Sequence, residues 1–113
     1  MHDIKAHLRY LPIPPQKVRL TVDLVRGKSA NEALEMLRFE TKGPAAPIRK
    51  LLASAVANAE ENFGVSRDDL YVATIFADEA PTRKWRRFGA RGRFKPVLRR
   101  NSHVTVVLRE RGS

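Results

Sequence analysis

Hydrophobic and polar residues alternate along the first segment of the chain. The apolar set of this alternation consists of Ile4, Ala6, Leu8 and Tyr10. A period of two over this length predicts a half-buried strand with those four side chains facing a core. Prolines at positions 12, 14 and 15 end the predicted strand, because proline has no N–H to donate to a sheet.

Helical spacing follows the prolines. The predicted first helix begins at Pro15, where a missing N–H is tolerated, and ends near Gly27. Its predicted apolar face consists of Val18, Leu20, Val22, Leu24 and Val25.

Two more helices are predicted in the first half of the chain. Ser29 to Glu32 has the form of a capping box, which satisfies N–H groups at the start of a short helix. The apolar face of that helix is Ala30, Ala33, Leu34 and Leu37. A break at residues 42–44 precedes the third helix, which should end near Gly64. Its apolar residues recur every three or four positions, at Ile48, Leu51, Leu52, Ala55, Val56 and Ala59.

Alternation returns in the second half of the chain and predicts two strands, at residues 70–77 and 103–109. The residues predicted to face inward are Leu70, Val72, Thr74, Phe76, Val104, Val106 and Leu108. Glycines at 89 and 92 predict a hairpin turn between the strands, on an arm that extends roughly 30 Å beyond them. The element order βαααββ predicts an α+β fold. In it, three helices cover a small three-stranded antiparallel sheet, and a long basic β-hairpin protrudes.

Length and composition limit the class of protein. The chain has 113 residues, a formal net charge of +10 and no cysteine. Its length predicts a single domain, with a globular part at 1–79 and 101–113 and an arm at about 80–100. The lack of cysteine excludes disulfides, a thiolate nucleophile and cysteine-based zinc sites. No apolar run approaches the roughly 18 residues that span a bilayer, and no signal-peptide stretch begins the chain. We therefore expect a soluble, cytoplasmic protein that does not bind membranes.

The excess positive charge is concentrated in one window. Residues 83–100 contain nine basic residues and no Asp or Glu, whereas the other 95 residues contain 13 basic and 12 acidic ones. The nine are Arg83, Lys84, Arg86, Arg87, Arg91, Arg93, Lys95, Arg99 and Arg100. Arginine binds phosphate in a bidentate manner, so this window predicts nucleic-acid contacts in preference to a merely solvated surface.

Aromatic residues and glycines interrupt the basic window. Trp85, Phe88 and Phe94 are candidates for stacking on unpaired bases. The alternative for Trp85 and Phe88 is packing between the arm and the domain. Gly89 and Gly92 are interpreted as turn residues, the alternative being close approach of another chain to the backbone.

A second basic cluster lies in the N-terminal part. It consists of Lys5, Arg9, Lys17, Arg19, Arg26 and Lys28. We expect these residues to contact phosphate as well. The alternative is that Arg26 interacts with a helix dipole and the others are solvated.

Catalysis finds little support in the sequence. The adjacent pairs Asp68–Asp69 and Asp78–Glu79 are the candidates for a Mg²⁺-dependent nuclease, but neighbouring strand residues point to opposite faces. The first pair fits a turn before a strand, and we expect the second to pair with the basic arm. The histidines lack metal-ligand spacing. We therefore expect no enzyme, metal or cofactor.

The rival binding function is an architectural protein that lays basic arms in a DNA minor groove, which commonly requires a dimer. Nothing in the sequence marks a dimer interface, so we expect no homo-oligomer.

Several sequence segments together resemble one family. The first are residues 9–10, 17–20 and 25–29, which read RY, KVRL and VRGKS, and the helical stretch ASAVANA at 53–59. ARGR at 90–93 and SHVTVV at 102–107 complete the set. Together they resemble bacterial-type large-subunit ribosomal protein L22 (uL22) over essentially the whole chain.

The resemblance implies a structural protein of the large ribosomal subunit that binds 23S-type rRNA and aids subunit assembly. It also implies a β-hairpin that lines the peptide exit tunnel, and neighbouring ribosomal proteins and the nascent polypeptide as partners. By position, the nine basic arm residues are rRNA-contact candidates. The tip that approaches the nascent chain corresponds to Gly89, Ala90, Arg91 and Gly92. The chain departs from the family pattern at Pro14, Gln16, Ala80 and Gly89; at Pro14 the family has a serine that would cap the first helix.

Overall fold

A three-stranded antiparallel sheet with the strand order β1-β5-β2 lies at the centre of the domain. In the computed structural model the strands are β1 (Ile4–Leu11), β2 (Leu70–Glu79) and β5 (Ser102–Glu110). The structure describes residues 3–40, 43–80, 83–88 and 94–111, and of 83–88 and 94–99 the backbone alone. The first and last strands of the chain are therefore paired with each other, Ile4 with Leu108.

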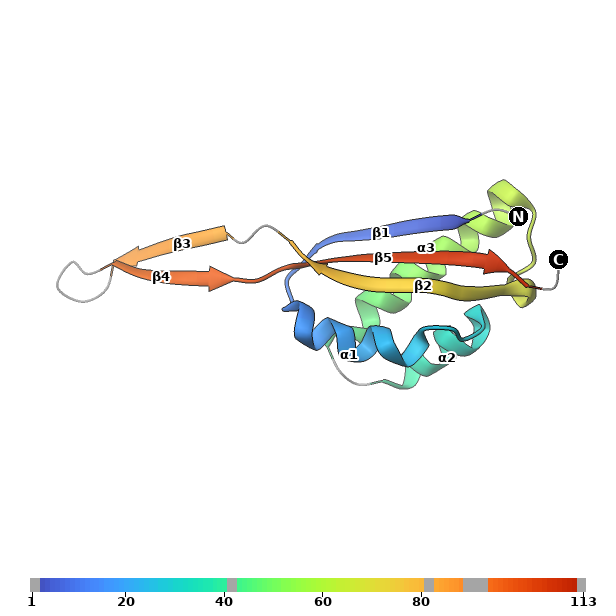
Figure 1. Ribbon diagram of the computed structural model, residues 1–113, viewed down its shortest axis with the longest axis horizontal. Helices are drawn as coiled ribbons and strands as arrows, with labels where there is room; N and C mark the ends of the chain where they lie inside the picture. Colours follow the sequence, from blue (N-terminus) through green and yellow to red (C-terminus); the bar gives the residue numbers. More distant parts are fainter. Residues whose placement is uncertain (1–2, 41–42, 81–82, 89–93, 112–113) are drawn as a thin grey trace.

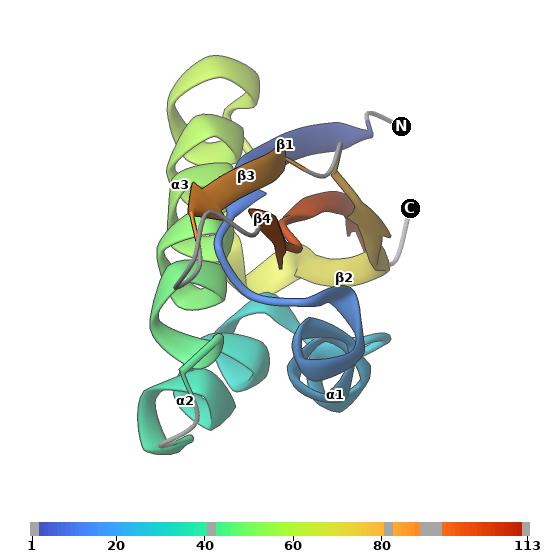
Figure 2. The ribbon, with the colours of Figure 1, turned by 90° about the vertical axis from the view of Figure 1, so that its left-hand side faces the viewer.

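In the part of the chain that the structure describes there are three α-helices, which lie on one face of this sheet (Figures 1 and 2). They are α1 (Pro15–Val25), α2 (Ala30–Phe39) and α3 (Ala45–Phe63), and a short 3₁₀ helix, η1 (Arg67–Asp69), leads into β2. Helix α1 lies beside β2 and α3 beside β1, with α2 packed on both helices. The α+β fold predicted from the element order is confirmed. Among the described residues, no helix lies on the opposite side of the sheet, which we call the open face.

The core lies between the sheet and the helices, and the helical periodicity predicted most of it. All six apolar residues predicted for α3 are buried, with exposed fractions of 0–7%. Val18, Val22 and Val25 of α1 are fully buried, as are Val104, Val106 and Leu108 of β5. Leu20 and Leu24, however, were wrongly predicted to widen the apolar face of α1. They are 59% and 41% exposed, because α1 buries only the side that faces β2 and α2.

The helix ends follow local sequence signals. The Ser29 hydroxyl accepts a hydrogen bond of 3.2 Å from the Glu32 N–H, which is the serine half of the predicted capping box. Gly27 and Gly64 have positive φ angles of 80° and 65°, a conformation that ends helices and favours glycine. Pro14 precedes α1 and provides no side-chain cap, in agreement with its departure from the family pattern.

Both edge strands contain a β-bulge, and the bulges overturn two sequence predictions. In β2 the register shifts between Val72 and Thr74, so that the alternation after the bulge is reversed. Ile75 and Ala77 are buried, whereas Phe76, predicted to face the core, is 39% exposed. In β1 the register shifts between Leu8 and Leu11, and Tyr10 is 52% exposed instead of buried. One extra residue transfers the following side chains to the other face of a strand.

Beyond the sheet, β3 (Arg83–Phe88) and β4 (Phe94–Arg99) form a separate two-stranded antiparallel ribbon. We call this ribbon the arm. It projects from the domain along the longest axis of a molecule that measures 65 × 26 × 18 Å (Figure 1). The predicted tip residues, Gly89, Ala90, Arg91 and Gly92, lie outside the described residues, as does Arg93.

Candidate nucleic-acid interface

The arm places basic residues directly opposite one another. In the register of β3 and β4, Arg83 pairs with Arg99 and Arg87 with Lys95. Like charges at opposed positions of an antiparallel pair destabilise it, and an isolated two-stranded ribbon is only marginally stable in water. A surrounding polyanion would remove this repulsion, so the register suits a ribbon inserted among phosphates.

The predicted arm residues are distributed over both strands. Arg83, Lys84, Trp85, Arg86, Arg87 and Phe88 belong to β3, and Phe94, Lys95 and Arg99 to β4. Arg100 follows β4 and is exposed. Phe88 and Phe94 form the last register pair before the tip.

Hydrogen bonds fix the base of the arm to the domain. The Ala80 N–H donates to the Asn101 carbonyl at 2.9 Å, which joins the two chain segments where they leave the sheet. The fully buried Ser102 hydroxyl donates to the Ile13 carbonyl at 2.6 Å, so the connection between β1 and α1 is held at the same place. These two hydrogen bonds hold the chain segments together where they leave the sheet.

The N-terminal basic cluster does not form one patch. Lys5 and Arg9 lie on β1, at one edge of the sheet. Lys17 and Arg19 lie on α1, and Arg26 and Lys28 directly after it, beside the other edge. The C-terminal end of β1 and the N-terminal end of α1 both lie at the end of the domain that carries the arm (Figure 1). Arg9 and Lys17 are thus nearest the arm, and both are exposed.

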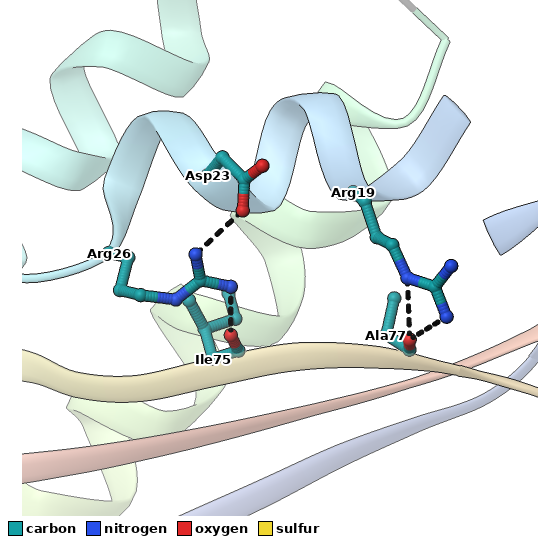
Figure 3. Close-up of polar contacts among 5 residues, drawn as sticks. All are labelled: Arg19, Asp23, Arg26, Ile75 and Ala77. Atoms are coloured by element: carbon teal, nitrogen blue, oxygen red, sulfur yellow. Dashed lines mark hydrogen bonds and ion pairs between the residues drawn. The ribbon is translucent and has the colours of Figure 1, made fainter. Parts of the chain in front are cut away.

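Two arginines of this cluster are used within the domain (Figure 3). The Arg19 guanidinium donates from Nε and Nη2 to the Ala77 carbonyl at 3.3 and 3.1 Å. Arg26 donates to the Ile75 carbonyl at 2.8 Å and forms an ion pair of 2.6 Å with Asp23. Both carbonyls belong to the edge strand β2, so the arginines occupy polar groups that would otherwise attract another strand. Sequence reasoning missed this role, since Arg26 was expected at phosphate or at a helix dipole.

Backbone contacts cover the rest of this edge. The Gly27 N–H donates to the Val72 carbonyl at 2.9 Å, and the Val72 N–H donates to the Lys28 carbonyl at 2.8 Å. Ser29 and Tyr71 form a β-bridge beside them. The segment that follows α1 thus protects the edge together with the two arginines.

Acidic residues of the domain are partly neutralised at the end opposite the arm. Asp3 and Arg109 form an ion pair of 2.7 Å, and the hydrogen bond from Arg109 holds the pKa of the Asp3 carboxyl below its usual value. Glu60 pairs with Arg67 at 2.7 Å, and this hydrogen bond raises the pKa of the Arg67 guanidinium. Both pairs are exposed, so they contribute little to stability.

The acidic pairs considered for catalysis do not assemble a metal site. Asp68 and Asp69 belong to η1, and Asp68 accepts a hydrogen bond of 2.8 Å from Asn31, which agrees with the predicted turn before a strand. Asp78 and Glu79 are exposed at the end of β2. In the part of the chain that the structure describes, no three His, Cys, Asp or Glu residues come together in a way that would hold a metal ion. The same part contains no helix long and apolar enough to cross a membrane.

Comparison with known proteins agrees with this arrangement. Residues 6–109 match the family model described as ribosomal protein L22p/L17e. The chain belongs to the L22p/L17e family of ribosomal proteins. It is 47% identical to the large ribosomal subunit protein uL22 of Desulfitobacterium hafniense (strain DSM 10664 / DCB-2) over 111 residues, 98% of this chain and 97% of that protein. It is also 47% identical to uL22 of Thermoanaerobacter sp. (strain X514) over 109 residues, 96% and 98% of the two chains.

Membership of the L22p/L17e family gives the general function. The chain is a structural constituent of the large ribosomal subunit, takes part in translation in the cytoplasm, and is not an enzyme. The resemblance stated from the sequence segments is therefore confirmed. The family implies association with the rest of the large ribosomal subunit.

Proposed function

We propose that the protein binds 23S-type rRNA chiefly through the arm, aids subunit assembly and lines the peptide exit tunnel with the tip of the arm. The observation that carries this proposal is the segregation of charge: nine basic residues and no acidic residue lie between positions 83 and 100. Basic residues lie opposite one another at two of the six register positions, and a bound polyanion would relieve their repulsion. Release of counterions from phosphates then supplies most of the affinity.

The domain contributes a second set of contacts in this proposal. Arg9 and Lys17 are exposed near the arm, and Lys5 and Lys28 extend the contacts along β1 and beyond α1. The guanidinium groups of Arg19 and Arg26 already donate to β2, so their first role is to hold α1 on the sheet. Any phosphate that they contact must use the N–H groups that remain exposed.

The first experiment removes charge from the arm and measures the salt dependence of rRNA binding. Arg83, Arg87 and Lys95 are replaced together by Gln in the full-length protein, and the control carries Gln at Arg38, Arg49 and Lys50 of the domain. Each lost phosphate contact should reduce the slope of log affinity against log salt by about 0.7–0.9. Three lost contacts therefore reduce it by about 2–3. An equal change in the control variant, or tighter binding to duplex DNA than to rRNA, would contradict the proposal.

The single tryptophan gives an independent signal from the arm. Trp85 lies on β3, so its fluorescence reports on the ribbon without interference from another tryptophan. We expect quenching and a shift of its emission when rRNA binds, since the indole ring would stack on a base. Emission that is identical in the free and bound protein would exclude Trp85 as a stacking residue.

A second experiment tests the tunnel position of the tip. Because the chain contains no cysteine, Ala90→Cys introduces one unique thiol at the predicted tip and Ser54→Cys introduces one on α3 as a control. In ribosomes with a stalled nascent chain, a short thiol-directed crosslinker should join position 90, but not position 54, to the nascent polypeptide. Equal crosslinking at both positions would remove the tunnel-lining assignment.

A further inference from the structure

The two β-bulges have the same result, although they lie on opposite edges of the sheet. Each adds one residue to an edge strand and transfers an aromatic side chain from the core side to the open face. Without the bulge in β2, strand alternation would place Phe76 on the same side as the buried Val72. Tyr10 is displaced in the same way at the end of β1. Both rings lie in the half of the sheet from which the arm projects.

Each exposed ring lies beside a residue of the central strand β5 on the open face. The rings of Tyr10 and His103 meet edge to face, with centroids 4.7 Å apart and an angle of 86° between their planes. The Tyr10 N–H donates to His103 Nδ1 at 3.1 Å. Thr105 lies opposite both Phe76 and His7, and its hydroxyl is 3.2 Å from His7 Nδ1. The central strand therefore separates the two aromatic rings, with His103 against Tyr10 and Thr105 opposite Phe76.

The backbone at Tyr10 is strained. Its φ is 56°, and among the described residues no other non-glycine residue has a positive φ. In this left-handed conformation the Cβ of an L-residue crowds the carbonyl oxygen that follows, so the residue must be held by surrounding contacts. Although the ring is half exposed, it is held against His103. An unfavourable backbone is thus maintained in a place where it displays an aromatic ring to solvent.

The charges around the rings favour a polyanion. Lys5 and Arg9 are exposed on β1, and Arg100 is exposed where the arm joins the sheet. Within the described residues, none of these three cations forms an ion pair with a carboxylate. One carboxylate, Asp78, lies opposite His103 and can accept hydrogen bonds from base amino groups or ribose hydroxyls.

We propose that the half of the open face next to the arm is a stacking platform for unpaired RNA bases, with Phe76 and Tyr10 as the stacking residues. The proposal rests on the proposed binding of rRNA and adds a site outside the arm. Sheet aromatics stack on bases that are not paired, while the flanking cations neutralise the adjoining phosphates. The rRNA segment bound there is therefore single-stranded and passes close to the base of the arm.

The test replaces Phe76 by Leu in the full-length protein and measures binding to 23S-type rRNA. Leucine keeps the apolar contacts of the half-buried side chain and removes the flat ring. The matched control is Phe39→Leu, at an aromatic residue that is 71% exposed at the end of α2, away from the open face. We expect Phe76→Leu to bind about tenfold more weakly than the wild-type protein and Phe39→Leu to bind like it.

Salt titration separates stacking from phosphate contact. Stacking releases no counterions, so Phe76→Leu should lower the affinity equally at all salt concentrations and keep the slope of the wild-type protein. Tyr10→Asn provides a second variant, because asparagine tolerates the left-handed backbone and the substitution removes the ring without adding strain. It should also weaken binding about tenfold. Thermal unfolding of each variant verifies that the fold is retained.

The outcomes distinguish this proposal from the one on which it rests. If the wild-type protein fails to bind rRNA, the proposed function itself fails. If the wild-type protein binds rRNA and both Phe76→Leu and Tyr10→Asn bind it as tightly as the wild type does, the platform is excluded and the arm remains the binding element. If these variants bind naked rRNA normally but enter large subunits poorly, the open face contacts a protein, which also overturns the proposal.

Discussion

The domain and the arm are both built on antiparallel strands, yet they obtain their order from different sources. In the domain, β5 lies between two other strands and is backed by helices, and its residues Val104, Val106 and Leu108 are fully buried. In the arm, β3 pairs with β4 alone, and basic residues lie opposite one another. The domain is held by its own hydrophobic core, whereas we propose that the arm becomes ordered on a negatively charged partner. Stability and binding should therefore respond to substitutions in different parts of the chain.

The largest effect on folding should come from the core. Leu52 is 1% exposed in the middle of α3, and Leu52→Ala should lower the free energy of unfolding by about 2–5 kcal/mol through lost burial and a residual cavity. Urea unfolding measures this change. The control is Leu20→Ala, at a residue that is 59% exposed, where we expect a change of about 0.5 kcal/mol or less. Similar losses in both variants would show that the core does not dominate stability.

A smaller effect is expected where a basic residue serves the domain instead of RNA. Arg26→Gln removes the donor to the Ile75 carbonyl and the ion pair with Asp23, and should lower the unfolding free energy by about 1 kcal/mol. The estimate is low because the Arg26 side chain is 47% exposed and screened by water. Lys17→Gln, near the start of α1, is the control and should leave stability unchanged. If Arg26→Gln alters only the salt dependence of RNA binding, the structural role assigned to Arg26 is wrong.

The smallest effect on folding should follow from removal of most of the arm. Deleting residues 84–95 should change the free energy of unfolding by about 1 kcal/mol or less, because β3 and β4 make their sheet only with each other. The unfolding transition, followed by circular dichroism, should stay cooperative, while rRNA affinity falls sharply. A broad, non-cooperative transition would mean that the arm takes part in the core and would remove the distinction between the two regions.

The parts of the fold that were predictable depend on short-range rules. The apolar face of α3 repeats at helical spacing, and Gly64 ends the helix as its sequence position indicated. The capping serine of α2 and the burial of alternate apolar residues on β5 follow from equally local patterns. These signals are carried by neighbouring residues and do not depend on the rest of the fold.

The bulges and the arginine contacts were not predictable because their causes lie far along the chain. The residues around Ala73 carry no sequence signal for a β-bulge. The one residue that the bulge adds was enough to move Phe76 out of the predicted core. Arg19 and Arg26 donate to carbonyls of a strand that lies about 50 residues away along the chain. The sequence does not distinguish these two arginines from the other basic residues on or next to α1. The charge of the arm, in contrast, could be read directly from the sequence, because it does not depend on which residues are neighbours in the fold.

The position of β5 has a consequence for the order in which the protein matures. Both β1 and β2 pair with β5 in the sheet, and β5 is synthesised after both of them. About a hundred residues separate residues 4–11 from their partner strand in the sequence, and a separation of this size makes pairing slow. The basic segment leaves the ribosome before the sheet that anchors it can close. A newly made chain therefore exposes its basic arm segment while the domain is still unfolded.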